Sequence, residues 1–212
     1  MKLYSMPISP NAIRVRALIH ELGLDVEIID KDMRSGELKS PEFLSLNPNG
    51  KVPVLEEDDG FTLWESRAIM AYLAVKAGST LYPVSDPRAQ AQVDQWQSWH
   101  AVHFAPTIQQ VLFERRLKPL FGLGEPDESK IEKTVKDAGE LLSVLDKGLE
   151  GKDYIAGDQM TLADISLACT AATLAQAGLL LEPYPAVAAW HLRMMERPAI
   201  QKAVAPAMEF FA

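Results

Sequence analysis

The chain has 212 residues and a mass of 23.4 kDa, enough for one large domain or two small ones, and 48% of its residues are hydrophobic. Its 21 Lys and Arg against 29 Asp and Glu give a net charge of −8, which disfavours nucleic acid and anionic membranes as partners. Cys169 is the only cysteine, which excludes an intramolecular disulfide and a zinc site built on several thiolates. The sequence has neither a signal-peptide pattern nor the roughly 20 apolar residues of a membrane span, so we expect a cytoplasmic protein.

The first eighty residues mix strand and helix patterns. Pro7 and Pro10 bracket a loop after the first strand, and Gly23 gives the following helix a stop signal. Because a helical crossover of about a dozen residues joins parallel strands, we expect the first two strands to pair in parallel. The Asp59-Gly60 pair predicts a hairpin between the last two strands. The expected elements are strands at 2–5, 26–29, 52–56 and 61–64, with helices at 13–22, 41–46 and 65–75.

The rest of the chain carries only helical patterns. Residues 77–87 are rich in Gly, Ser, Thr and Pro, which is typical of a linker. Helices are expected at 88–118, 128–149, 161–178, 185–197 and 199–206, with a kink at Pro106 in the first of them. The sequence therefore predicts an α/β domain over residues 1–76, a linker over 77–87 and an all-α helical domain over 88–212.

Ser9 and Ser66 lie close to the starts of predicted helices, where backbone N–H groups carry a partial positive charge that favours an anion. The Ser9 hydroxyl has two roles open to it: it can cap the first helix, or it can donate a hydrogen bond to a bound anion such as a thiolate. Ser66 offers the same two roles at the start of the helix at 65–75. Glu65 beside it can hold an ammonium group.

A further unusual feature is Pro53, the second residue of a predicted strand. Proline cannot donate a hydrogen bond to a sheet. Either this is an edge strand that tolerates a proline, or the Val52 backbone is left free to pair with something else. A cis Val52–Pro53 bond would turn those backbone groups outward.

Together these motifs resemble the glutathione S-transferase family over essentially the whole chain. The resemblance implies a thioredoxin-like N-terminal domain, an all-helical C-terminal domain that contributes the electrophile pocket, a homodimer, and glutathione as co-substrate without a metal. The serine-type phi branch is most similar, followed by theta and delta, on the spacing of Ser9, Asn11 and Arg14, the stretch Lys39-Ser40-Pro41-Glu42, and the segments Tyr154–Asp158 and Thr161–Asp164.

The resemblance also implies roles for individual residues. Ser9 matches the hydroxyl that binds the glutathione sulfur, and Asn11 assists it; these two are the implied catalytic residues. Lys39 matches the lysine that meets the glycyl carboxylate. Lys51 stands where the phi pattern usually has Gln, and there it adds a second cation; Leu38 stands where that pattern usually has His.

The remaining glutathione contacts follow in the same way. The Val52 backbone, oriented by a cis Pro53, matches the segment that pairs with the cysteinyl residue. Glu65 and Ser66 match the residues that hold the γ-glutamyl ammonium and carboxylate groups. The implied reaction is attack of a bound glutathione thiolate on a small hydrophobic electrophile.

Other functions stay open on the sequence. The same thiolate could serve a peroxidase, a dehalogenase or an isomerase. A protein that binds hydrophobic ligands or partners without turnover could keep the same fold, although it would not need Ser9, Glu65 and Ser66. A glutaredoxin-like disulfide exchanger is disfavoured because the loop before the first helix has no cysteine.

His103 and Phe104 are weaker candidates for the electrophile pocket. They lie in the first predicted helix of the second domain, where an aromatic stripe serves either a pocket or core packing. His100 and His103 lack a third ligand at convincing spacing, so no metal site is predicted.

Two further features point to folding rather than chemistry. Thr161 and Asp164 have the spacing of a capping box at a helix start. Cys169 lies among apolar residues, so we expect a buried small side chain and not a nucleophile.

Overall fold

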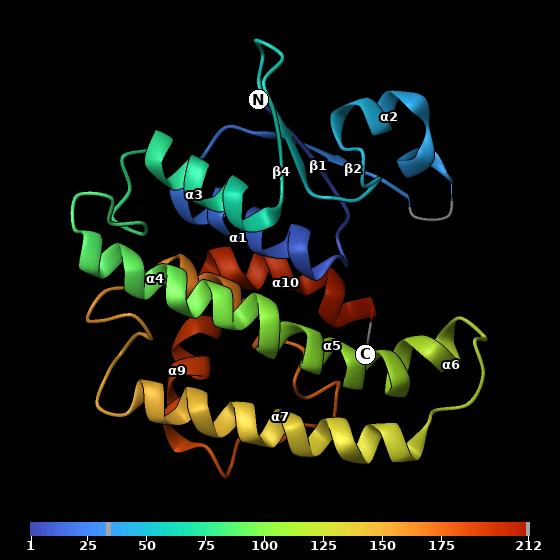
Figure 1. Cartoon of the computed structure of the whole chain (residues 1–212), viewed down its shortest axis with the longest axis vertical. Coiled ribbons are helices and arrows are strands. Elements are labelled where there is room, and N and C mark those ends of the chain that lie inside the picture. The colour runs from blue at the N-terminus through green and yellow to red at the C-terminus, as the bar shows by residue number, and fades with distance from the viewer. Residues whose placement is uncertain (33–34, 211–212) are drawn as a thin grey trace.

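The structure, a computed structural model, describes residues 1–32 and 35–210. A four-stranded sheet flanked by helices is followed by an all-helical part, so the predicted fold class is confirmed (Figure 1). The first part comprises β1 (Lys2–Ser5), α1 (Pro10–Leu22), β2 (Glu27–Asp30), the 3-10 helix η1 (Glu37–Lys39), α2 (Pro41–Leu46), β3 (Val54–Glu56), β4 (Thr62–Trp64) and α3 (Ser66–Lys76). The second comprises α4 (Pro87–Trp99), the π-helical η2 (His100–Phe104), α5 (Ala105–Leu112), the π-helical η3 (Phe113–Leu117), α6 (Lys118–Leu120), α7 (Glu128–Leu149), α8 (Leu162–Ala171), α9 (Pro185–Met195) and α10 (Pro198–Phe210).

The strands lie in the order β2-β1-β3-β4, with β1 parallel to β2 and antiparallel to β3. Side chains alternate along β1, because successive residues of a strand point to opposite faces. Leu3 is fully buried in the core with residues of α1, such as Leu18. Tyr4 points to the other face, where its ring meets Phe43 of α2 at a centroid distance of 6.0 Å. Helices therefore cover both faces of the sheet.

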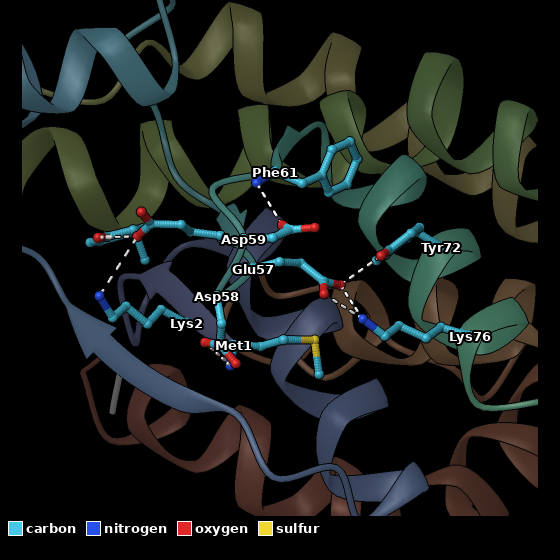
Figure 2. A network of polar contacts seen from close by, with 10 residues as sticks. Met1, Lys2, Glu57, Asp58, Asp59, Phe61, Tyr72 and Lys76 are labelled. Carbon is cyan, nitrogen blue, oxygen red and sulfur yellow. Dashed lines mark hydrogen bonds and ion pairs between the residues drawn. The ribbon is translucent and has the colours of Figure 1, made fainter.

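The β3–β4 hairpin forms where the Asp-Gly pair predicts it (Figure 2). Asp59 accepts a hydrogen bond from the Phe61 N–H at 3.0 Å and so closes the turn. Glu57 accepts hydrogen bonds from the Tyr72 hydroxyl at 2.6 Å and from Lys76, which tie the hairpin to α3. The strand predicted at 52–56 is shorter and begins at Val54.

The helical part rests on the first helix of the chain. In Figure 1, α10 runs beside α1, and α7 lies farthest from the sheet. α1 packs against both α10 and α8, so one core continues from the α/β part into the helical part. Within residues 1–32 and 35–210, no helix has the length and apolar character needed to cross a membrane.

Two predicted helices differ from the structure. The helix expected at 88–118 is interrupted by π-helical turns at His100–Phe104 and Phe113–Leu117, and the irregular backbone comes before Pro106, which lies in the first turn of α5. The helix expected at 161–178 ends at Ala171, and turns follow it to Gly178. Side chains of Arg115 and Arg116 donate to backbone carbonyls of these turns, at Ala177 and Gln176. Such long-range contacts cannot be read from local periodicity.

Candidate active site

A cavity of about 630 Å³ lies between the start of α1, the loop before β3 and the helical wall formed by α5 and η3. In Figure 1 the segment that leads from β1 into α1 lies above α5. The α/β part contributes the polar side chains of Ser9, Asn11 and Lys51 among apolar ones, whereas the helical side is mainly apolar. Its lining residues include Ile8, Ser9, Pro10, Asn11, Leu38, Gly50, Lys51, Val52, Pro106, Gln109, Gln110, Leu112, Phe113, Leu117 and Phe121.

Ser9 occupies the N-cap position of α1 but its hydroxyl makes no capping hydrogen bond. Its backbone carbonyl instead accepts the first helical bonds, from Ala12 N–H at 2.9 Å and Ile13 N–H at 2.8 Å. Of the two roles open to this hydroxyl, the capping one is therefore not used. The side chain lines the cavity next to Asn11, at a helix end whose dipole favours negative charge.

The loop at 47–51 places cationic groups at one end of this cavity. The buried Asn47 holds the loop: its Oδ1 accepts from Asn49 N–H at 3.0 Å, and its Nδ2 donates to the Lys51 carbonyl at 2.7 Å. Lys51 lines the cavity, and Lys39 Nζ donates to the Asn49 carbonyl at 3.3 Å. A Cβ at Gly50 would lie 2.7 Å from Lys39 Nζ, so the second lysine sits directly on this loop.

The peptide bond between Val52 and Pro53 is cis, as predicted. Pro53 is buried, and the ladder between β1 and β3 begins one residue later, at the Tyr4–Val54 pair. The Val52 backbone therefore lies outside the sheet, at the edge of the cavity that Val52 lines. An extended peptide ligand would find backbone groups there with which to pair.

A second cavity, of about 290 Å³, adjoins the first along Asn11, Pro106 and Gln109, which line both. Glu65 and Ser66 lie at its rim, at the start of α3. Glu65 has a φ of 73°, in the left-handed region that residues other than glycine rarely adopt, and such backbone strain clusters at functional sites. Neither side chain caps the helix, because no capping bond is present at Glu65 and Ser66 has no hydrogen-bond partner among the described residues.

Two guanidinium groups complete the second cavity. Arg14 is 2% exposed, donates from Nε to the Pro10 carbonyl at 3.4 Å, and has no carboxylate partner within residues 1–32 and 35–210. Burial lowers the pKa of Arg14 to about 10, which leaves it charged at neutral pH. Arg67 donates to the Ser98 hydroxyl at 3.2 Å, while its buried Nε has no partner. With Glu65 opposite, the cavity offers both signs of charge, as a zwitterionic amino-acid group requires.

The residues expected to form the electrophile pocket lie elsewhere. Phe104 is fully buried and stacks on Trp99 at a centroid distance of 5.5 Å, so the expectation that it lines a pocket is wrong. His103 is exposed and lines neither of the two cavities. The π-helical backbone of η2 changes the direction of these side chains relative to a regular helix, which spacing alone does not reveal.

Two other groups that could be reactive, Cys169 and His100, are buried in the core. Burial raises the pKa of the Cys169 thiol to about 12, so it stays protonated at neutral pH, as expected for a structural cysteine. His100 is fully buried, and its Nε2 lies 2.8 Å from the Thr170 hydroxyl. In the described parts of the chain, no three His, Cys, Asp or Glu side chains come together to hold a metal ion.

Comparison with known proteins agrees with this geometry. The family model described as "Glutathione S-transferase, N-terminal domain" matches residues 1–75, and "Glutathione S-transferase, C-terminal domain" matches residues 99–198. The chain belongs to the glutathione S-transferase family. Glutathione S-transferase 3 of Zea mays is 39% identical over 97% of this chain and 93% of its own length.

Solved structures of the family superpose on the whole chain. Glutathione transferase F7 from Populus trichocarpa has a TM-score of 0.89 at 34% identity, with 97% of this chain and 98% of that chain covered. Glutathione S-transferase I from mais, solved in complex with an atrazine glutathione conjugate, has a TM-score of 0.91 at 33% identity, with 98% and 97% covered. The chain is therefore an enzyme of the glutathione transferase type with the thioredoxin-like and helical parts of that family.

Sequence reasoning missed several residues of this transferase site. Asn47 has a readable signal, because an Asn two residues before another Asn-Gly pair is typical of a turn held by its own side chain. Gln109 and Phe113 have none, because an unbroken helix would not predict which side of α5 and η3 faces the α/β part. The spacing of Arg14 from Ser9 is readable in the sequence, but its burial beside Glu65 and Ser66 depends on the fold.

Proposed function

We propose that this enzyme ionises the thiol of glutathione beside Ser9 and directs the thiolate onto small hydrophobic electrophiles held against α5 and η3. The observation that carries the proposal is the Ser9 hydroxyl, which lines the cavity at the start of α1 and is not used as a helix cap. A hydroxyl in that place can donate to a sulfur anion. Asn11, two residues after Ser9, lines the same cavity, and we propose that it assists Ser9.

The free energy needed to ionise the thiol is within what Ser9 and the start of α1 can supply. With a free thiol pKa of about 8.5, only about 3% of glutathione is thiolate at pH 7. Lowering that pKa by about two units ionises most of the bound thiol and requires about 2.7 kcal/mol of preferential stabilisation. A hydrogen bond to a charged group contributes about 1.5 to 3 kcal/mol, and a helix N-terminus about 0.3 to 1 kcal/mol. Ser9 and the α1 dipole are together sufficient, so no general base is needed.

The two cavities suggest how the tripeptide lies. We place the γ-glutamyl end in the smaller cavity, with its ammonium on Glu65 and its carboxylate at Ser66 and the start of α3. The cysteinyl residue pairs with the Val52 backbone next to the cis Pro53. The glycyl carboxylate then reaches Lys51 on the loop at 47–51 and Lys39, which contacts that loop from η1. This order brings the sulfur to the middle of the site, near Ser9.

The helical wall supports the hydrophobic character of the second substrate. Pro106, Leu112, Phe113, Leu117 and Phe121 face the cavity, and the described lining contains no carboxylate. The similar structure from mais holds an atrazine glutathione conjugate, which fits a transfer reaction. A peroxidase, dehalogenase or isomerase would use the same thiolate with a different second substrate. A protein without turnover would leave the free Ser9 hydroxyl unexplained.

The assembly and location are also proposals. We propose a homodimer in the cytoplasm, which follows from the family resemblance, and gel filtration should give a mass near twice 23.4 kDa. We further propose a division into residues 1–76 and 88–212 with a linker at 77–87. The family models, which match residues 1–75 and 99–198, support this division.

One assay tests the function. Purified protein is mixed with glutathione and a reactive aryl halide, and conjugate formation is followed by absorbance, with Ser9→Ala as the comparison. We expect turnover in the natural protein and about a 10-fold lower rate at pH 7 in Ser9→Ala, because the thiolate fraction of bound glutathione falls from about 75% to about 10%. Equal rates in the two proteins would remove Ser9 from the mechanism, and no conjugation by the natural protein would contradict the transferase assignment.

A further inference from the structure

Gln109 is a polar residue on the helical wall of the large cavity, and its side chain is not held by another residue that the structure describes. It lies in α5 and is half-buried, and it lines both cavities of the site. No residue in 1–32 or 35–210 forms a hydrogen bond with its side-chain amide. The amide therefore faces the space in which the two substrates would meet.

Neighbouring residues show that this freedom is particular to Gln109. Gln110, which also lines the cavity, donates to Glu114 Oε1 at 3.4 Å and is turned toward that carboxylate. Pro106, Gln109 and Phe113 follow one another at helical spacings of three and four, so they share a face. Gln109 is thus a free neutral donor between two apolar side chains.

An amide in such surroundings discriminates between ligands. Covering it with an apolar molecule that has no acceptor removes its water without replacing the lost hydrogen bonds, which is unfavourable. A molecule with an acceptor oxygen in reach does not suffer this loss. Sites built around a buried polar group reject ligands that lack the matching group more strongly than apolar pockets reject extra bulk.

We propose that Gln109 is a specificity-determining residue that selects neutral electrophiles in which a carbonyl or nitro oxygen is conjugated to the attacked carbon. This inference rests on the proposed function, because it concerns the second substrate of the same thiolate. A carboxylate on the electrophile is disfavoured, because a second anion would repel the thiolate and the cations Lys51 and Lys39 are already assigned to the glycyl carboxylate of glutathione.

The step can be written for an unsaturated ketone. The thiolate forms a bond to the β-carbon, and the electron pair of the carbon–carbon double bond moves through the α-carbon onto the carbonyl oxygen. Gln109 Nε2 donates a hydrogen bond to that oxygen as its negative charge develops. The enolate then takes a proton from water at the α-carbon, which balances the proton that the glutathione thiol released to solvent. Nothing leaves, and no oxidant or reductant is involved.

The test compares two electrophiles of similar size in each protein preparation: a phenyl-substituted unsaturated ketone, and a phenyl-substituted haloalkane that has no acceptor oxygen. The variants are Gln109→Leu, which removes the donor, and Gln109→Glu, which keeps the size and places a charge beside the reacting oxygen. Gln110→Leu, on the same wall, is the matched comparison. Because the ratio of the two rates is read within one sample, partial loss of folded protein does not affect it.

We expect Gln109→Leu to lower kcat/KM for the ketone by about 10-fold to 100-fold, somewhat less than the loss of a fully enclosed oxyanion donor, and the haloalkane rate by less than about threefold. Gln109→Glu should lower the ketone rate at least as much, and the KM for glutathione should stay the same in both. In Gln110→Leu the ratio of the two rates should stay within about twofold.

Three outcomes would overturn the inference. Equal losses on both electrophiles would mean that Gln109 only shapes the wall. A higher KM for glutathione with an unchanged ratio would mean that Gln109 binds the tripeptide through the smaller cavity. If the natural protein conjugates neither electrophile, the proposed function fails and this inference fails with it, whereas turnover of both with an unchanged ratio rejects the inference alone.

Discussion

The helices α8 and α1 each have a hydroxyl residue at the N-cap position, and they use it in opposite ways. At the start of α8, Thr161 and Asp164 form a reciprocal capping box, and Asp164 is fully buried. At the start of α1, the Ser9 hydroxyl caps nothing and lines a cavity. In the first arrangement both carboxylate oxygens of Asp164 are paired within the protein, whereas the second leaves a hydroxyl available to a ligand. The comparison separates a residue that holds the fold from a residue placed for chemistry.

The largest effect, a loss of stability, is expected from a substitution at the start of α8. Asp164 accepts hydrogen bonds from the N–H groups of Ile155 and Thr161 at 2.9 Å and from Trp190 Nε1 at 3.0 Å. Asp164→Ala leaves these buried donors unpaired, so we expect a loss of about 3 to 5 kcal/mol in unfolding free energy. Urea denaturation measures it. The exposed Asp158→Ala is the control and should change stability by less than about 0.5 kcal/mol.

In the same Asp164→Ala protein, the fraction that remains folded should bind glutathione as tightly as the natural protein does. A normal unfolding curve would show that the capping box is dispensable. A weaker affinity in the folded fraction would show that the start of α8 contributes to the site, and the contrast between the two helix starts would then be lost.

The next largest effect is the reverse of the first: a substitution at Ser9 should lower activity and leave stability unchanged. We expect Ser9→Ala to unfold within about 0.5 kcal/mol of the natural protein, because no capping hydrogen bond is lost, while its conjugation rate at pH 7 falls about 10-fold. Ser40→Ala is the matched control: the Ser40 hydroxyl accepts from Phe43 N–H at 3.2 Å, so its loss should cost about 1 kcal/mol of stability. A large loss of stability in Ser9→Ala would place this hydroxyl with the caps after all.

A third variant, Ser66→Ala, tests whether the hydroxyl at the start of α3 also serves a ligand and not the fold. Ser66 is 6% exposed, and its hydroxyl has no partner among the described residues. Ser66→Ala should weaken glutathione binding about 10-fold, the loss of one hydrogen bond to a charged group, with kcat little changed. Calorimetry with glutathione and with cysteinylglycine, which lacks the γ-glutamyl group, makes the measurement specific. Equal weakening of both ligands would place the γ-glutamyl group elsewhere.

The smallest effect is a pH dependence in the electrophile wall. Glu114 is 3% exposed at its side chain and pairs with Lys118 and Lys130, each at 2.9 Å. These hydrogen bonds lower the pKa of Glu114 from 4.5 to about 2. Because the folded pKa is lower than the unfolded one, the pair stabilises the fold above about pH 4.5, and this stabilisation disappears as the pH falls toward 2.

Glu114→Gln should therefore flatten the decline of unfolding free energy between pH 4.5 and pH 2. Urea denaturation at pH 5 and pH 3 gives the two points for each protein. An identical decline in the variant would show that other carboxyl groups account for acid sensitivity.

The sequence predicts features that depend on neighbours along the chain. The cis bond before Pro53, the Asp59-Gly60 turn and the Thr161–Asp164 box each follow from the local chemistry of a few residues. The same holds for the βαβ arrangement, because a crossover helix leaves few alternatives. Except for the box at the start of α8, these features belong to the α/β part, which contributes Ser9, Lys51 and Val52 to the cavity.

The helical wall could not be predicted in the same way. Phe104 and Phe113 are both aromatic residues of one helical stretch, yet the first is buried in the core and the second lines the cavity. The two π-helical turns shift the side-chain directions, and a periodicity that assumes a regular α-helix does not predict them. The side of the site that depends on local motifs can therefore be predicted from the sequence, whereas the side that depends on helix packing cannot.

The ionisation of bound glutathione tests the central claim most directly. Glutathione is titrated into the protein across the pH range, and the ultraviolet absorbance of its thiolate is followed in the natural protein and in Ser9→Ala. We expect a midpoint of about 6.5 in the natural protein, about two units below that of a free thiol, and a midpoint of about 8 in the variant, in which only the start of α1 still favours the thiolate. The same midpoint near 8.5 in both proteins would contradict thiolate stabilisation by Ser9 and the start of α1.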